Sequence, residues 1–335
     1  MLKLKTEGIE LLVPDLQQMR MIAYALQVRL RGEVADRRFD DAIVTTKTLF
    51  AMSRHMGEHP SAVGFLVANA VASLVIEPFE ELVQQPGCPN LFWALTDLPS
   101  PLVSLRLALQ GDRTALINAI GTVDDKEPMT KAQVEKAIQS FQSLLNGFRV
   151  EPKQDVRKWL AIRTSDKAKV TAIRRRLVER GLADDVVKSF PATQVLLLDD
   201  KMAYEERRDN ALKGLLLPYW QVQALGDANP AKDDSLLLSR IVPFFGKVRQ
   251  SQARTEQSFA LLRCVEALRL HAAEHNGKFP AKLAEVKLPL PVDPISGQPF
   301  GYRLEARTAI LRGAAPRGLE KVAFYNIRYD VTLAK

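Results

Sequence analysis

The chain has 335 residues, which is longer than one hydrophobic core usually serves, so its length predicts two or three folding units. With 47% hydrophobic and 26% charged residues, its composition is that of an ordinary globular protein and excludes wholesale disorder. The formal net charge of +8 favours anionic surfaces without defining a partner. Two cysteines, Cys88 and Cys264, exclude a multi-disulfide framework and a multi-cysteine zinc site but allow one disulfide.

The first sixteen residues lack the apolar core and the small-residue cleavage site of a secretory signal, so we expect no signal peptide in this chain. The longest apolar run, residues 62–76, is shorter than the roughly 20 residues of a membrane span. It also contains Asn69 and meets Glu77 and Pro78. A buried helix explains this run better than a transmembrane segment, which we do not expect in this chain.

The first part of the chain has the periodicity of packed helices. From Pro14 to Leu30, apolar residues recur at steps of three and four, which predicts a helix with one apolar face. A polar stretch at 36–41 then precedes a second helical pattern, so the two predict a helical hairpin. A third helix is predicted over 61–84, with Ser61 as its cap, and short helices are expected after the turn cluster at 86–90.

The middle of the chain also reads as helical. The predicted helices are 113–120, 131–145, 154–162, 167–180, 183–188 and 193–224, and Pro218 is expected to kink or end the last. Four pairs of adjacent aspartates lack the spacing of a calcium loop, so we interpret them as helix starts or solvated turns. These pairs are Asp124–Asp125, Asp184–Asp185, Asp199–Asp200 and Asp233–Asp234.

Residues 226–234 resemble a linker, because they combine Gly, Pro, Asn and charge without periodicity. After it, Pro243 and Gly246 are expected to interrupt the helical pattern, and a long helix is predicted over 247–275. Its apolar stripe consists of Leu261, Val265, Leu268 and Ala272. Asn276 and Gly277 tolerate the left-handed conformation that ends helices. Alternating residues then predict strands over 300–304, 308–311 and 323–331.

The predicted fold class is therefore mainly α. We expect an irregular, solenoid-like array of helical hairpins, followed by a long helix and a small antiparallel β-sheet. The expected organisation is a helical-hairpin region at 1–150, a basic helical region at 151–228, and the long helix with its α+β tail at 235–335.

Two stretches of the tail resemble the C-terminal half of type II secretion pseudopilins. In those proteins a long helix ends in a Gly-x-Tyr/Phe-Pro turn, and an Asp-Pro-x-x-Gly-x-Pro-Phe/Tyr loop leads into strands. The matching residues here are 277–280, Gly-Lys-Phe-Pro, and the loop from Asp293 to Phe300. The resemblance covers about 60 residues and implies a pseudopilin-like α+β tail. It does not imply assembly into a pilus, because some 240 residues precede it.

Most of the chain also resembles a group of uncharacterised planctomycete proteins. The matching segments are FDDAIVTTKTLFAMSRHMGEHP, EELVQQPGCPNLFWALTDLPSPLVSLRLALQGDR and RCVEALRLHAAEHNGKFP, together with the Asp293 loop. This resemblance implies tetratricopeptide-like hairpins, a pilin-like tail, a location in the cell envelope and no known activity. The regular 34-residue period of true tetratricopeptide repeats is not found in the sequence.

His271, Glu274 and His275 match the H-x-x-E-H pattern of inverted zincins, in which two imidazoles bind zinc and the glutamate activates water. Positions i and i+4 share a helical face, so the spacing permits a site. A third ligand would have to come from Glu285 or Glu305. The motif lies in the last turn of its helix, and the pseudopilin resemblance explains the segment without a metal. We therefore favour a solvated or core-edge histidine pair over a zinc hydrolase.

The remaining candidates for chemistry are weak. His55 and His59 have the same spacing, but Gly57 and Pro60 interrupt the helix that would align them. Cys88 lies between Gly87 and Pro89 with no base placed beside it, so a buried or disulfide-bonded cysteine is favoured. The sequence contains no phosphate-binding glycine motif, and we expect no cofactor.

The strongest charge feature is the basic region 153–180, which centres on Arg174, Arg175 and Arg176. Such a region could neutralise phosphates of nucleic acid or of acidic lipid. Ile162, Val170, Ile173 and Leu177 supply an apolar face, however, so the basic residues also fit the solvated side of amphipathic helices.

The sequence thus predicts a non-catalytic binding or scaffold protein of the bacterial cell envelope, whose partner is another protein or a peptide. A zinc hydrolase using 271–275 and a module binding nucleic acid or acidic lipid through 153–180 are the two alternatives.

Overall fold

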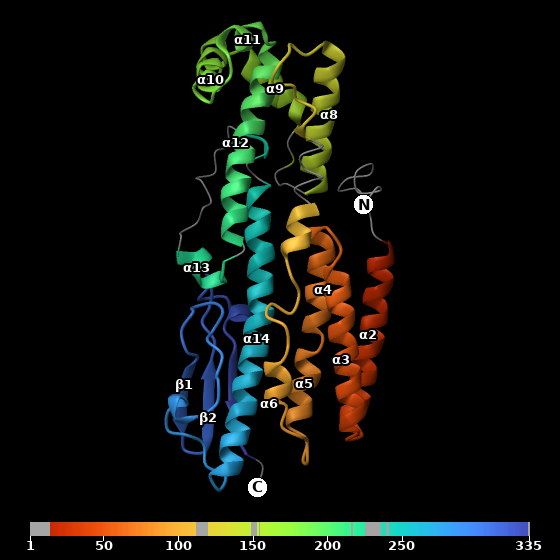
Figure 1. The fold of residues 1–335 in the computed structure, drawn as a ribbon, viewed down its shortest axis with the longest axis vertical. Helices are drawn as coiled ribbons and strands as arrows, with labels where there is room; N and C mark the ends of the chain where they lie inside the picture. Colours follow the sequence, from red (N-terminus) through yellow and green to blue (C-terminus); the bar gives the residue numbers. More distant parts are fainter. Residues whose placement is uncertain are drawn as a thin grey trace. The chain divides into compact units, whose positions relative to one another are not determined.

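The computed structural model describes residues 14–111, 120–148, 153, 155–215, 217–224, 236–238 and 241–333. In this part of the chain, twelve α-helices and one three-stranded antiparallel sheet are found (Figure 1). This confirms the predicted class, which is mainly helical with a long helix followed by a small sheet. The predicted helix at 113–120 and the predicted linker at 226–234 fall almost wholly outside the described residues.

The chain divides into two compact units, each built from separate stretches of sequence. Unit 1 holds the described residues within 109–216 and 227–247, and unit 2 those within 13–108, 217–226 and 248–335. These units cut across the three consecutive segments expected from the sequence. The physical reason is that segments far apart in the sequence contact each other, which the composition of the chain does not reveal. For example, Asn69 Nδ2 donates to Thr255 Oγ1 at 3.1 Å within unit 2.

Unit 2 begins with the predicted helical hairpin, which consists of α2 (Pro14–Ala35) and α3 (Phe39–Gly57). Residues 61–84, expected to form one helix, form two: α4 (Ala62–Ser73) and α5 (Ile76–Val83). Pro78 explains the break, because it has no N–H to donate to the Leu74 carbonyl four residues earlier and so fits the first turn of a new helix. Ser61 caps α4 as predicted, since its Oγ accepts from Gly64 N at 3.0 Å. The short helix α6 (Phe92–Thr96) follows.

The long helix α14 (Val242–Glu274) begins five residues before the predicted start, and Pro243 lies in its first turn, where proline is tolerated. Its predicted end is confirmed, because Asn276 and Gly277 have φ of 56° and 74°. Between Val248 and Ala272 none of its residues is exposed. The helix is therefore covered on all sides rather than along the predicted stripe alone.

The sheet has the strand order β1 (Gly301–Glu305), β2 (Thr308–Arg312), β3 (Arg328–Val331), and both pairings are antiparallel. Leu311, in the central strand, lies between Tyr302 and Tyr329. β3 is shorter than predicted because Ala323–Tyr325 forms a 3-10 turn. The inner face of the sheet packs on α14 in one apolar cluster. Its buried members include Ala260, Leu261, Cys264, Val265, Leu268, Phe300, Ala309 and Leu311.

The loop from Asp293 to Phe300 is held by its first residue. Asp293 is 1% exposed, and its carboxylate accepts from Ile295 N at 2.8 Å, from Ala314 N at 2.6 Å and from Gln257 Nε2 of α14 at 2.9 Å. Further along the loop, Gly297 adopts φ of 69° directly under the Trp220 ring. Trp220 belongs to α13 (Tyr219–Ala224), so the loop contacts both α14 and α13.

Unit 1 contains α8 (Lys131–Gly147), α9 (Val156–Thr164), α10 (Lys167–Glu179), α11 (Asp184–Ser189) and α12 (Ala192–Leu215). Side chains define three of the starts: Thr130 and Gln133 form a capping box at α8, and Asp155 and Asp166 cap α9 and α10. The predicted interruption at Pro218 is confirmed, because this residue lies between α12 and α13.

Replacing Gly297 with alanine should destabilise unit 2 more than the same replacement at Gly87. Both glycines have positive φ, so each variant should lose roughly 1–2 kcal/mol from backbone strain. Only at Gly297 would the new Cβ also meet the Trp220 ring, at 2.6 Å, which adds roughly 1–3 kcal/mol of overpacking. At Gly87 it would meet nothing within 4 Å. Urea unfolding followed by tryptophan fluorescence measures both losses, and equal losses would contradict the packing described for this loop.

Candidate functional site

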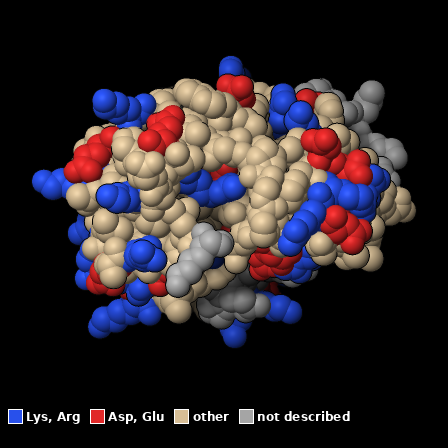
Figure 2. Space-filling model, turned by 90° about the horizontal axis from the view of Figure 1, so that it is seen from below, with Lys and Arg blue, Asp and Glu red and all other residues tan. Residues whose placement is uncertain are grey.

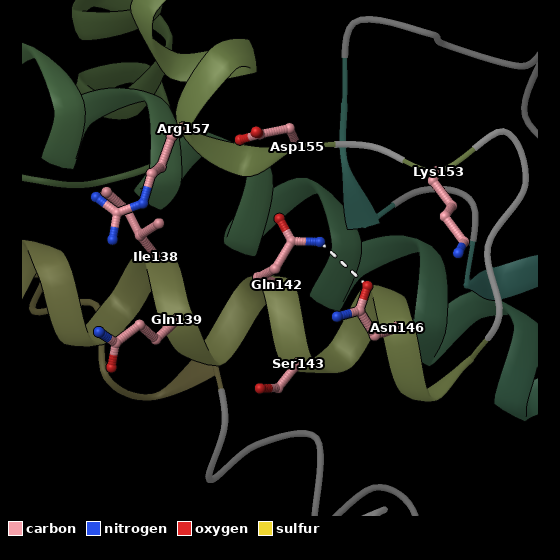
Figure 3. Close-up of a pocket in the computed structure, with 8 residues that line it drawn as sticks. All are labelled: Ile138, Gln139, Gln142, Ser143, Asn146, Lys153, Asp155 and Arg157. Carbon is pink, nitrogen blue, oxygen red and sulfur yellow. Dashed lines mark hydrogen bonds between the residues drawn. The ribbon is translucent and has the colours of Figure 1, made fainter.

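The candidate site is a cavity of about 610 Å³ in unit 1, at the helix α8, and most of the residues that line it are polar or charged (Figure 3). The helix contributes Ile138, Gln139, Gln142, Ser143 and Asn146, and the segment around the start of α9 contributes Lys153, Asp155 and Arg157. The spacing of the four polar residues of α8 places them on one side of the helix. The opposite side, with Ala137, Phe141, Leu144 and Leu145, is buried in unit 1.

Two of the amides are linked to each other and to the wall of the cavity. Gln142 Nε2 donates to Asn146 Oδ1 at 3.2 Å, the dashed contact in Figure 3. Gln142 Oε1 accepts from Val156 N at 3.0 Å, which fixes the amide against the start of α9. Among the described residues that line the cavity, none accepts a hydrogen bond from the Asn146 side-chain amide or from the Ser143 hydroxyl. The cavity thus presents both donors and acceptors to a bound molecule.

Two of the charged side chains that line the cavity, Arg157 and Asp155, are held by hydrogen bonds to neighbouring groups. Arg157 pairs with Glu135 through two hydrogen bonds, and this pairing lowers the pKa of the Glu135 carboxyl. Asp155 accepts from Lys158 N at 3.0 Å as the cap of α9. Figure 3 shows Ser143 directed away from Asp155 and Lys153, so no base lies beside this hydroxyl in the view. The arrangement suits hydrogen bonding of a polar ligand better than anion capture or nucleophilic catalysis.

The structure brings His271 and His275 together at the end of α14, but as stacked rings. Their centroids are 3.9 Å apart and their planes differ by 8°. The nitrogen lone pairs lie in the ring planes, so those of two parallel rings do not converge on one ion. His275 Nδ1 also lies 2.7 Å from the His271 carbonyl oxygen. Burial and the neighbouring His275 ring lower the pKa of His271.

The carboxylates proposed for that zinc site are placed for other contacts. Glu274 is exposed, Glu285 Oε2 accepts from Ala281 N at 2.9 Å, and Glu305 pairs with Arg303 at 2.6 Å. Among the described residues, no three His, Cys, Asp or Glu side chains are grouped so that they could hold a metal ion. The geometry therefore gives the zinc alternative no support.

His59 and the two cysteines contribute to packing, whereas His55 lies at the surface. His55 is exposed in the last turn of α3, whereas His59 is half-buried against Gly64 with Nδ1 2.8 Å from Ser61 Oγ. Burial lowers the pKa of His59. Cys88 and Cys264 are both buried and both free, so the disulfide that the sequence allows does not form. Burial raises the pKa of Cys264 to about 12.

The three candidate anion-binding arginines differ in their surroundings. Arg174 donates to the carbonyl oxygens of Val187 and Phe190, at the end of α11. Arg176 forms a two-bond pair with the buried Asp199, at 2.8 Å from Nε to Oδ1, and Arg180 adds a contact at 3.3 Å. Arg175 is exposed. Two of the three arginines, Arg174 and Arg176, thus form hydrogen bonds within unit 1, and the exposure of Arg175 and Arg176 fits the solvated side of an amphipathic helix.

The charged side chains on the face shown in Figure 2 are not sorted by sign. On the face that Figure 2 shows, basic and acidic side chains of the described residues are interspersed rather than collected by sign. In the basic region, Arg157 is paired with Glu135, and the Arg163 guanidinium lies 4.6 Å from the centre of the Trp159 ring.

One expectation about the aspartate pairs is wrong. Asp199 and Asp200 were interpreted as a helix start or solvated turn, but they lie inside α12, where seven consecutive residues from Gln194 are buried. Asp199 pairs with Arg176, and the Asp200 carboxylate accepts from Leu237 N at 2.7 Å and Leu238 N at 3.2 Å. Burial raises the pKa of Asp200 to about 7; the two N–H donors and Arg207 oppose this rise, and Asp199 adds to it.

Comparison with family models, with curated proteins and with solved structures finds no match to this chain. The resemblances to pseudopilins and to the planctomycete group therefore stay predictions. The segment Ala62–Val83 has the length and composition of a membrane-spanning helix, and 56% of its most apolar window is buried inside the protein. Core helices of globular proteins have the same properties.

The buried Asp200 predicts an unusual dependence of stability on pH. Its folded pKa, about 7, lies above the ordinary value of 3.8, so between these two values the folded state holds a proton that the unfolded state releases. The contribution of Asp200 to the free energy of unfolding is therefore largest at low pH, and it falls as the pH rises from about 4 to 7, by about 1.4 kcal/mol per unit of pKa shift. Asp200→Asn should flatten this part of the profile.

The free energy of unfolding, measured by urea titration from pH 4 to 8, tests this expectation. Asp209→Asn is the matched control, since Asp209 lies on the same helix and is 44% exposed. Parallel profiles for wild type and Asp200→Asn would contradict it.

Proposed function

We propose that this chain is a non-catalytic binding protein and that unit 1 holds an extended segment of a partner protein in the cavity beside α8. The observation that carries the proposal is the row of amide and hydroxyl side chains, Gln139, Gln142, Ser143 and Asn146, along a cavity of about 610 Å³. An extended backbone offers alternating N–H and C=O groups. Amide side chains both donate and accept, so they match such a backbone without requiring charge.

The length of this row of polar side chains matches a short extended segment of a partner protein. Gln139 and Asn146 are seven residues apart, which corresponds to about 10 Å along a helix. About three residues of extended chain cover this length. The apolar side chain of Ile138, at one end of the lining, can contact one side chain of the bound segment.

The distribution of reactive side chains supports binding over catalysis. All four histidines of the sequence, at 55, 59, 271 and 275, belong to unit 2, so the cavity in unit 1 lacks the commonest general base. The stacked rings of His271 and His275 do not favour a zinc hydrolase. The internal bonds of Arg174 and Arg176 do not favour a phosphate-binding surface. A protein or peptide partner in the cell envelope, the location implied by the planctomycete resemblance, stays our proposal.

Selection from a random peptide library displayed on phage, with the full-length chain immobilised, tests this function. Wild type should enrich a set of peptides, and the double variant Gln139→Leu, Asn146→Leu should lose them, because each leucine removes donors and acceptors from the cavity. Gln142 is left intact because it holds the start of α9. Binding of the enriched peptides by fluorescence anisotropy should weaken at least tenfold, the loss of one or two hydrogen bonds.

Ala161→Leu is the matched control, since it adds an exposed leucine to α9 outside the cavity lining. This variant should bind the peptides as wild type does. Failure to enrich any peptide, or equal binding by the double variant, would contradict the proposed function.

A further inference from the structure

The helix α2 has two apolar faces, and only one of them is covered within unit 2. Its inner face, with Ala23, Leu30 and Val34, is buried, and α3, α4 and α5 pack on α2. On the opposite face Met21 and Val28 are 68% and 71% exposed. Helical arrays normally end in a polar outer face, because an apolar one lowers solubility. The outer face of α2 therefore needs an explanation.

The exposed residues of this face follow a heptad pattern. Met21, Ala25, Val28, Gly32 and Ala35 are separated by four, three, four and three residues, and all five are exposed. We call these five residues the outer stripe of α2. This alternation, with an average period of 3.5 residues, is the pattern by which one helix packs against another in a coiled coil. The stripe thus has the chemistry of a helix-pairing surface.

The stripe is complementary to itself when two copies run antiparallel. In one antiparallel register, Met21 faces Gly32 of the second copy. Ala25 then faces Val28 of the second copy, because the two helices run in opposite directions. Each layer then combines a larger side chain with a smaller one. Gly32 has room for the methionine, because an atom at its Cβ position would meet nothing within 4 Å. A parallel pair would instead place Gly32 on Gly32 and Ala25 on Ala25, which leaves gaps.

The flanking side chains are compatible with the same arrangement. In this register Tyr24 would lie beside Arg31 of the second copy, which would place a guanidinium against a ring face. Arg31 is already paired with Glu81 at 2.6 Å, and Arg29 with Glu33 at 2.6 Å, so neither brings an uncompensated charge to the interface. The antiparallel register also keeps the two Arg31 side chains on different layers.

We propose that the outer stripe of α2 joins two copies of this chain as an antiparallel helix pair about a two-fold axis. The stripe and its flanks extend over about 18 residues, or about 27 Å of helix. A single helix pair of this length is smaller than a standard protein interface, so the dimer dissociates on dilution. This surface is separate from the cavity of unit 1 and does not depend on the proposed function.

Sedimentation equilibrium of the full chain across a range of micromolar concentrations tests the dimer. Wild type should shift from monomer to dimer with concentration, and Val28→Glu should raise the dissociation constant at least tenfold by placing a charge in the seam. Val63→Glu is the control, because Val63 is a similarly exposed valine, at 52%, on α4. A wild type that stays monomeric, or a dimer that Val28→Glu leaves unchanged, would overturn the proposal.

Cross-linking tests the direction of the helices. Chains carrying Ala25→Cys and chains carrying Val28→Cys should form a disulfide-linked pair efficiently when mixed under oxidising conditions, and poorly when either is oxidised alone. The natural cysteines do not interfere, because both are buried. Efficient linkage of each variant with itself would indicate parallel helices and overturn the antiparallel arrangement.

Discussion

The structure depends on polar side chains that long helices carry into the interior, where they bind the backbone of loops. In unit 1, Gln194 of α12 accepts from Met129 N at 2.8 Å and donates to the carbonyl oxygens of Asp124 and Glu127, at 2.9 and 2.8 Å. In unit 2, Glu266 of α14 accepts from Leu91 N at 2.6 Å, and Gln252 donates to Val103 O at 2.9 Å. Each bond satisfies a buried group that would otherwise cost roughly 1–3 kcal/mol.

This constraint explains why the polar residues inside the protein do not assemble into a reactive site. Glu266 is fully buried and its pKa is raised by burial, a feature typical of catalytic carboxyls, but its oxygens are occupied by Leu91 N and Arg269. Asp293 is similarly occupied by Gln257 and two backbone N–H groups. The cavity beside α8 differs, because its amides line an open space, and this difference is the reason to place binding there.

Features governed by local chemistry could be predicted from the sequence. The end of α14 at Asn276 and Gly277 follows from two residues that tolerate positive φ, and the first two strands follow from alternating apolar residues. The break at Pro218 follows from the missing N–H of proline. The division of 61–84 into α4 and α5 also has a local signal, Pro78, but the continuous apolar run around this proline predicts one helix.

Features that depend on distant partners could not be predicted in this way. The polar pair Asp199 and Asp200 predicts a helix start or a solvated turn, because the sequence does not reveal that Arg176 and the N–H groups of Leu237 and Leu238 bind these carboxylates. The cavity was missed for the same reason. The polar face of α8 shows in the spacing of its amides, but the approach of Asp155 and Arg157, which form the other side of the cavity, does not.

Native-state hydrogen exchange at three loop amides tests most directly whether buried side chains of the long helices hold the loops. The amides are those of Leu91, Met129 and Ala314, which donate to Glu266, Gln194 and Asp293 respectively. The account predicts that they exchange as slowly as amides in the interior of α12 and α14, because each opens only when its unit unfolds. Exchange at the rate of freely exposed loop amides would contradict it.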